Sequence, residues 1–113
     1  MILKDVDQIV VSPTTIIEVH SIIKRKLKEH FLDQKQALWL REQVEIDFQY
    51  YLEIQWNVNL VNITKEVINE LPLKILDCLQ LASAILAKAD LFITSDQILY
   101  QAAVKRIDKA VFI

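Results

Sequence analysis

Three carboxylates occupy positions where a parallel α/β sheet gathers ligands. Asp77 is the only charged residue in the apolar run 75–87, and Asp96 comes directly after a predicted strand over 90–94. Glu18 lies near the start of the helix that follows another predicted strand, over 8–12. Ligands of open parallel sheets bind at the carboxyl ends of the strands. We therefore expect Glu18, Asp77 and Asp96 to converge on one edge of the sheet.

A cluster of carboxylates has a defined chemistry. Like charges raise one another's pKa values unless a cation is present, and hard divalent ions such as Mg²⁺ or Mn²⁺ prefer oxygen ligands. Such a site supports attack of metal-activated water on a phosphodiester. Structural roles remain open for each acid, because Asp77 suits the helix dipole, Asp96 suits an N-cap and Glu18 suits a capping box.

The elements that would position these acids alternate along the chain in the order β-α-α-β-α-α-β-α-β. Strands are predicted over 8–12, 57–62, 90–94 and 110–113, and helices over 13–28, 33–54, 64–70, 73–88 and 96–106, with Thr64 capping the third helix. This alternation predicts an α/β sandwich with a mostly parallel sheet. The length of 113 residues fits a single domain over 1–113. An unrelated α/β domain in which the acids act only as caps remains an alternative.

The segment 33–54 carries two apolar stripes at helical spacing. One stripe begins at Ala37, and the other includes Trp39, Ile46, Tyr50 and Ile54. One core face needs only one stripe. Either the helix breaks near Glu45, or the second stripe packs on a partner.

The composition excludes several classes of protein. Glycine is absent, which rules out Gly-rich phosphate loops and leaves Asn or Asp for turns that need positive φ. The single cysteine permits no internal disulfide, and the net charge of −2 argues against binding nucleic acid through a global positive field. Without a long apolar run we expect no signal peptide and no membrane span, which predicts a cytoplasmic protein.

Three segments together resemble the PIN domain, in particular the VapC-type toxins of bacterial toxin–antitoxin pairs. They are Val11–Val19, which contains Glu18; Leu76–Ala84, which begins Leu-Asp-Cys-Leu-Gln-Leu-Ala; and Phe92–Asp96, which is followed by Leu99 and Ala102-Ala103. In order and spacing they span nearly the whole chain. The resemblance implies a three-layer α/β sandwich and a ribonuclease that depends on Mg²⁺ or Mn²⁺. It makes Glu18, Asp77 and Asp96 the metal-binding and catalytic acids, with Thr94 and Ser95 as possible support.

One part of the family pattern has no counterpart. The family begins with a central strand that carries an Asp, followed by a helix, and neither Asp5 nor Asp7 matches that position. The departure predicts a PIN-like domain that is N-terminally incomplete, lacks one metal ligand and has impaired activity. A misassigned start, a decayed gene, or closure of the two sheet halves on each other or on a second copy would each explain it. The alternative function is an inactive remnant that dimerises or binds an antitoxin.

Partners follow from the same resemblance and from two surface features. Lys24, Arg25 and Lys26 form a basic cluster that either contacts RNA phosphates or is a solvated helix face. Trp39 and Tyr50 either close the core or lie in an interface, where aromatic residues are concentrated. The resemblance implies an RNA substrate, a cognate antitoxin and a homodimer, with no membrane partner.

Overall fold

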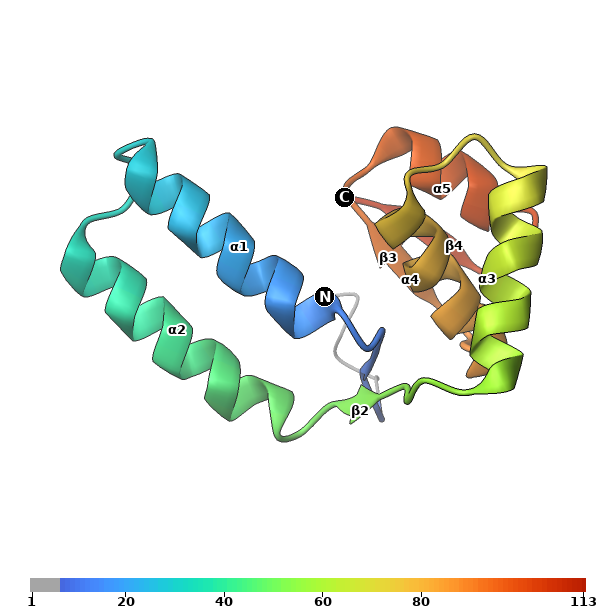
Figure 1. Ribbon diagram of the computed structural model, residues 1–113, viewed down its shortest axis with the longest axis horizontal. Helices are drawn as coiled ribbons and strands as arrows, with labels where there is room; N and C mark the ends of the chain where they lie inside the picture. The colour runs from blue at the N-terminus through green and yellow to red at the C-terminus, as the bar shows by residue number, and fades with distance from the viewer. Residues whose placement is uncertain (1–6) are drawn as a thin grey trace. The chain divides into compact units, whose positions relative to one another are not determined.

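The computed structural model describes residues 7–113 and has an α/β fold (Figure 1). None of the helices in this part of the chain combines the length and the apolar character that crossing a membrane requires. The elements are β1 (Val10–Val11), α1 (Thr15–Lys28), α2 (Gln34–Phe48), β2 (Leu52–Glu53), α3 (Val58–Glu70), α4 (Ile75–Leu86), β3 (Phe92–Thr94), α5 (Gln97–Ala103) and β4 (Ala110–Phe112). Helices and strands alternate as predicted, although the second strand is not the predicted one.

The described residues divide into two compact units. The first comprises residues 7–9 and 13–52, and the second comprises Val10–Ser12 and Glu53–Ile113. Glu18 belongs to the first unit, whereas Asp77 and Asp96 belong to the second. Whether residues 1–113 form one domain stays a prediction.

The first unit is a helical hairpin, in which α1 and α2 pack side by side (Figure 1). His20 Nε2 and Glu45 Oε1 lie 2.9 Å apart and link the two helices. Asp33 begins α2 with a capping box, in which its side chain accepts from the Gln36 backbone N–H and the Gln36 side chain accepts from the Asp33 backbone N–H. Among the described residues of this hairpin, only Ile23 and Ala37 are fully buried. The hairpin therefore has very little core of its own.

Helix α2 is continuous, so the predicted break near Glu45 is wrong, and so is the extension to Ile54. The interior of the helix contains no proline or glycine that would interrupt it. Ala37 is buried and Phe48 half-buried, whereas Trp39 and Tyr50 on the second stripe are 60% and 79% exposed. Ile54 is half-buried against a core cluster of the second unit, and the other residues of the stripe, Trp39, Ile46 and Tyr50, thus form an outward face of the hairpin. That it packs on a partner stays a prediction.

The second unit holds most of the core. Its fully buried side chains include Leu60, Val67, Cys78, Leu81 and Leu99. Helix α4 is the central element: it packs against α3, α5 and β1, and Cys78 fills a fully buried position in it. Helix α5 lies against β3 and β4. The absence of other charges after Asp77 in α4 is explained by this burial.

The structure corrects two predictions for residues 57–64. The expected strand over 57–62 is the first part of α3, and Thr64 lies inside the helix rather than capping it. The cap is Asn57, whose Oδ1 accepts a hydrogen bond of 2.8 Å from the Leu60 backbone N–H. The hydroxyl of Thr64 donates to the Leu60 carbonyl at 2.7 Å. Leu60 and Val67 are buried at helical spacing, and this spacing overrides the local alternation of Asn with Val and Leu.

The described strands form two separate parallel pairs. Strand β3 pairs with β4 in the register Phe92↔Ala110, Ile93↔Val111 and Thr94↔Phe112. Strand β1 pairs with β2, and the Leu52 N–H donates to the Ile9 carbonyl while the Ile54 N–H donates to the Val11 carbonyl. From the first bond to the second, the donor and the acceptor both move two residues forward in the sequence, which is the pattern of parallel strands. No ladder joins the two pairs within residues 7–113.

Positive φ occurs at residues other than those expected. His30 has φ 65° and Lys88 has φ 54°, and neither is Asn or Asp. Each ends a helix in a Schellman motif: the Phe31 N–H donates to the Lys26 carbonyl at 2.9 Å, and the Ala89 N–H to the Ala84 carbonyl at 3.0 Å. The helix-ending hydrogen bonds hold these L-residues in the left-handed region despite the cost of doing so.

Candidate functional site

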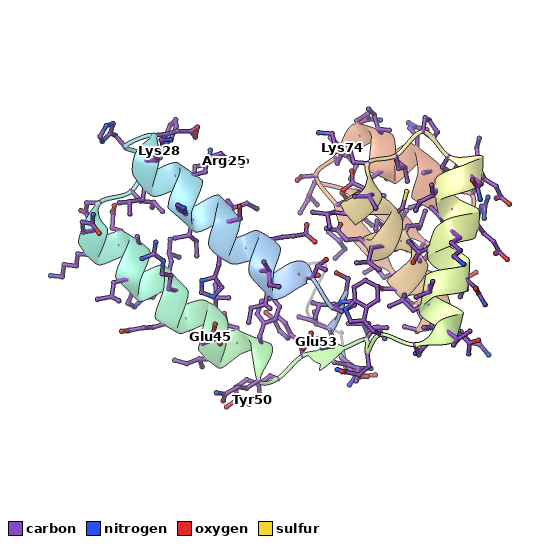
Figure 2. The ribbon with its side chains drawn as sticks, in the orientation of Figure 1. Arg25, Lys28, Glu45, Tyr50, Glu53 and Lys74 are labelled. Atoms are coloured by element: carbon purple, nitrogen blue, oxygen red, sulfur yellow. The ribbon has the colours of Figure 1, made fainter. Side chains whose placement is uncertain are left out.

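Asp77 lies in the first turn of α4, where the peptide dipoles favour a negative charge. Its side chain is half-buried. Lys74 is the N-cap of this helix and makes no side-chain capping bond; Figure 2 shows it at the start of α4. Because the rest of the helix packs into the core, Asp77 is held at the rim of that core.

Asp96 is the N-cap of α5. Its Oδ1 accepts a hydrogen bond of 2.9 Å from the Leu99 backbone N–H. The hydroxyl oxygen of Thr94 accepts from the Asp96 backbone N–H at 3.1 Å, and Ser95 is exposed. Thr94 therefore helps to fix the turn between β3 and α5 that carries Asp96. The alternative role as a cap is real for Asp96, and the cap leaves its second carboxylate oxygen for another ligand.

The charges of Asp77 and Asp96 interact. Partial burial raises the pKa of Asp77, the negative charge of Asp96 raises it further, and the positive charge of Lys74 acts in the opposite direction. This arrangement brings two of the three predicted acids together, in one unit of the chain. Lys74 was not predicted as a partner of Asp77, although its place three residues before Asp77 at a helix start was available as a signal.

Glu18 lies in the first turn of α1 and accepts a hydrogen bond of 2.8 Å from the Thr14 hydroxyl. The capping-box alternative is wrong for this residue. Thr14 is the N-cap but makes no side-chain capping bond, and Glu18 lies four residues beyond it rather than three. Convergence of Glu18 with Asp77 and Asp96 stays a prediction.

The acid pair fits a hard cation in its donor chemistry. Two neighbouring carboxylates offer oxygen ligands, and a divalent ion would relieve the repulsion that raises the pKa of Asp77. Within residues 7–113, no three His, Cys, Asp or Glu side chains are grouped so that they could hold a metal ion. Asp5 lies outside the described residues, and Asp7 is exposed.

The basic cluster lies on the second half of α1. Lys24 and Arg25 are exposed, while the Lys26 ammonium lies 4.7 Å from the centre of the Phe31 ring. Figure 2 shows Arg25 and Lys28 near the end of α1 that leads into α2. In the described part of the chain none of these cations forms an ion pair.

Comparison with known proteins gives one match. The model of the PIN domain family matches residues 2–105, which is most of the chain and includes all three predicted acids. Neither a curated protein nor a solved structure matches.

Proposed function

Because this chain belongs to the PIN domain family, whose members are generally nucleases that bind divalent metal ions, we propose that it is a metal-dependent ribonuclease of the VapC toxin type. The observation that carries the proposal is the placement of two acids at the starts of two packed helices, Asp77 in the first turn of α4 and Asp96 at the N-cap of α5. The direction of the Asp77 pKa agrees with this placement, because the charge of Asp96 contributes to raising it. The match of residues 2–105 to the PIN domain family also supports the proposal.

Each residue of the site has a proposed task. Asp77 and Asp96 hold Mg²⁺ or Mn²⁺, Glu18 is the third acid, and Thr94 fixes the backbone that presents Asp96. The ion, when bound, supplies an activated water and neutralises charge on the phosphodiester. Lys24, Arg25 and Lys26 contact phosphates of the RNA.

Impaired activity is part of the proposal. Two separate parallel pairs are an unusual arrangement, since parallel strands normally lie inside a larger, covered sheet. Apolar side chains next to the acids are also uncovered, and Ile75 and Ile98 are 68% and 63% exposed. Both observations support a sheet that, within residues 7–113, lacks the strand which would bring a further acid. We therefore propose slow cleavage rather than efficient turnover.

Cleavage of a fluorescent single-stranded RNA in Mn²⁺ tests the assignment, with Asp96→Asn and EDTA as controls. Asn is as good an N-cap as Asp, so Asp96→Asn removes the charge while keeping the bond to the Leu99 N–H. We expect slow cleavage by the natural chain, and loss of cleavage to the background level in both controls.

Two results would contradict the enzymatic proposal. Cleavage that persists in Asp96→Asn would show that the acid pair is not the site. No cleavage by the natural chain at high concentration would instead favour the second candidate function.

The second candidate is an inactive PIN domain that acts as a binding module. The observation in its favour is the α1–α2 hairpin, with its two buried residues and its exposed Trp39 and Tyr50. Either a second copy of the chain or a cognate antitoxin would cover this face. Aromatic side chains of this kind are common anchors of interfaces.

A further inference from the structure

A groove at the start of α3 combines an exposed aromatic ring with free polar groups. It has a volume of about 450 Å³ and is lined by Trp56, Asn57, Val58, Val61, Asn62 and Lys65. All of these residues belong to the second unit of the chain. Trp56 is 59% exposed, although it is a large ring with ample apolar surface to bury. Trp56 therefore does not serve mainly to fill the core.

Two polar residues of the groove are available for a ligand. In the described chain the Asn62 amide makes no hydrogen bond and the Lys65 ammonium makes no ion pair. Asn57 differs, because its carbonyl oxygen caps α3 and its amide nitrogen donates to the Gln55 carbonyl at 3.2 Å. The groove thus offers one ring face, one free amide and one free cation.

We propose that this groove binds one unpaired nucleotide of a single-stranded RNA. The Trp56 ring would stack on the base, the Asn62 amide would hydrogen-bond to the base edge, and the Lys65 ammonium would contact a phosphate. Stacking on aromatic rings and charge contact with the backbone are the two main terms in binding of unpaired RNA. The positive charge of Lys65 matches a phosphate, which favours RNA over an apolar peptide.

The position of the groove makes it a subsite for flanking RNA. Helices α3 and α4 pack side by side and are joined by a short connection, so α3 begins at the opposite end from Asp77 (Figure 1). The 13 residues of α3 span about 20 Å. A nucleotide in the groove is therefore well separated from the acid pair and is not the one that is cleaved. The inference rests on the proposed function only in taking RNA as the ligand.

Binding without cleavage tests the groove. The probe is a fluorescent single-stranded RNA of about 12 nucleotides in EDTA, within the usual range of site sizes. Trp56→Ala should weaken binding roughly 5- to 150-fold, the usual effect of losing one stacked base. Ile68→Ala is the matched control, because Ile68 is an exposed apolar residue of the same helix that does not line the groove, and it should leave affinity unchanged.

Three further variants distinguish a loss of stacking or of charge from a folding defect. Trp56→Phe keeps a ring and should recover most of the affinity. Lys65→Gln should lower the slope of log affinity against log salt concentration by about 0.7, as expected for one lost phosphate contact. In the Trp39→Phe variant Trp56 is the only tryptophan, and RNA should quench its fluorescence.

The outcomes distinguish this inference from the nuclease proposal. Quenching and Trp56-dependent affinity without any cleavage would support the groove and contradict the nuclease. Cleavage that needs Asp96, together with equal RNA affinity of Trp56→Ala and Ile68→Ala, would support the nuclease and overturn the groove. No binding of RNA in EDTA would also overturn the groove.

Discussion

At the scale of single residues, the most informative group is the Asp77 carboxyl. Its raised pKa means that the folded state holds the proton more tightly than the unfolded chain does. Ionised Asp77 therefore lowers the free energy of unfolding at neutral pH. The penalty disappears as the pH falls through the raised pKa to the ordinary value of 3.8, where both states are protonated. A carboxylate that served only the dipole of α4 would not explain this penalty, whereas a bound cation would remove it.

The Asp77→Asn variant makes this measurable. At pH 7 without divalent ions we expect it to be more stable than the natural chain, by less than about 1 kcal/mol because the group is partly solvated. The gain should vanish near pH 4. With Mn²⁺ the order should reverse, since binding stabilises only the chain that keeps the carboxylate. Urea unfolding at several pH values measures the difference in the free energy of unfolding between the two proteins. If Mn²⁺ stabilises both proteins equally, the assignment of Asp77 as a metal ligand is wrong.

At the scale of elements, the helix ends show how a chain without glycine closes its helices. Lys88 takes positive φ after α4, and His30 does so after α1. An L-residue in this conformation destabilises the folded state by about 1–2 kcal/mol. Glycine avoids this cost, but it also makes the unfolded chain more flexible, which offsets part of the gain in stability.

Lys88→Gly should therefore raise the free energy of unfolding by about 0.5–1 kcal/mol. Lys88→Ala is the control, because it removes the same side chain but keeps the Cβ that makes positive φ costly. Thermal unfolding of the three proteins measures the difference. If alanine stabilises as much as glycine does, the effect comes from the lysine side chain and the backbone explanation fails.

The sequence predicts best those elements whose signals lie within a few residues of one another along the chain. Asp33 and Asp96 are caps that bond to backbone N–H groups three residues ahead, and the burial of α4 is visible in its apolar run. The strand expected over 57–62 is wrong because Asn57, Asn59 and Asn62 create an alternation by chance. Strand β2 was missed because its two residues are chosen by pairing with distant Ile9 and Val11. Asp77 and Asp96 come from successive helices of the second unit, so the order of elements predicts that they are neighbours, whereas Glu18 belongs to the first unit.

At the scale of the whole molecule, the two units differ in what they bury. The second unit has a core of Leu, Val, Ala and Ile side chains around α4, whereas the hairpin buries only Ile23 and Ala37 among its described residues. An isolated pair of helices gains most of its stability from packing on an apolar face. The exposed stripe with Trp39 and Tyr50 is the face on which such packing would occur.

The last prediction concerns this face. If it joins two copies, the mass measured by sedimentation should rise with concentration toward that of a dimer. Trp39→Ala or Tyr50→Ala should then weaken association by at least about 30-fold, since truncation of an aromatic hot spot costs about 2 kcal/mol or more. Trp56→Ala removes an equally exposed ring from the other unit and should leave the mass unchanged. A chain that stays monomeric at every concentration contradicts the dimer and leaves an antitoxin as the remaining occupant of the hairpin.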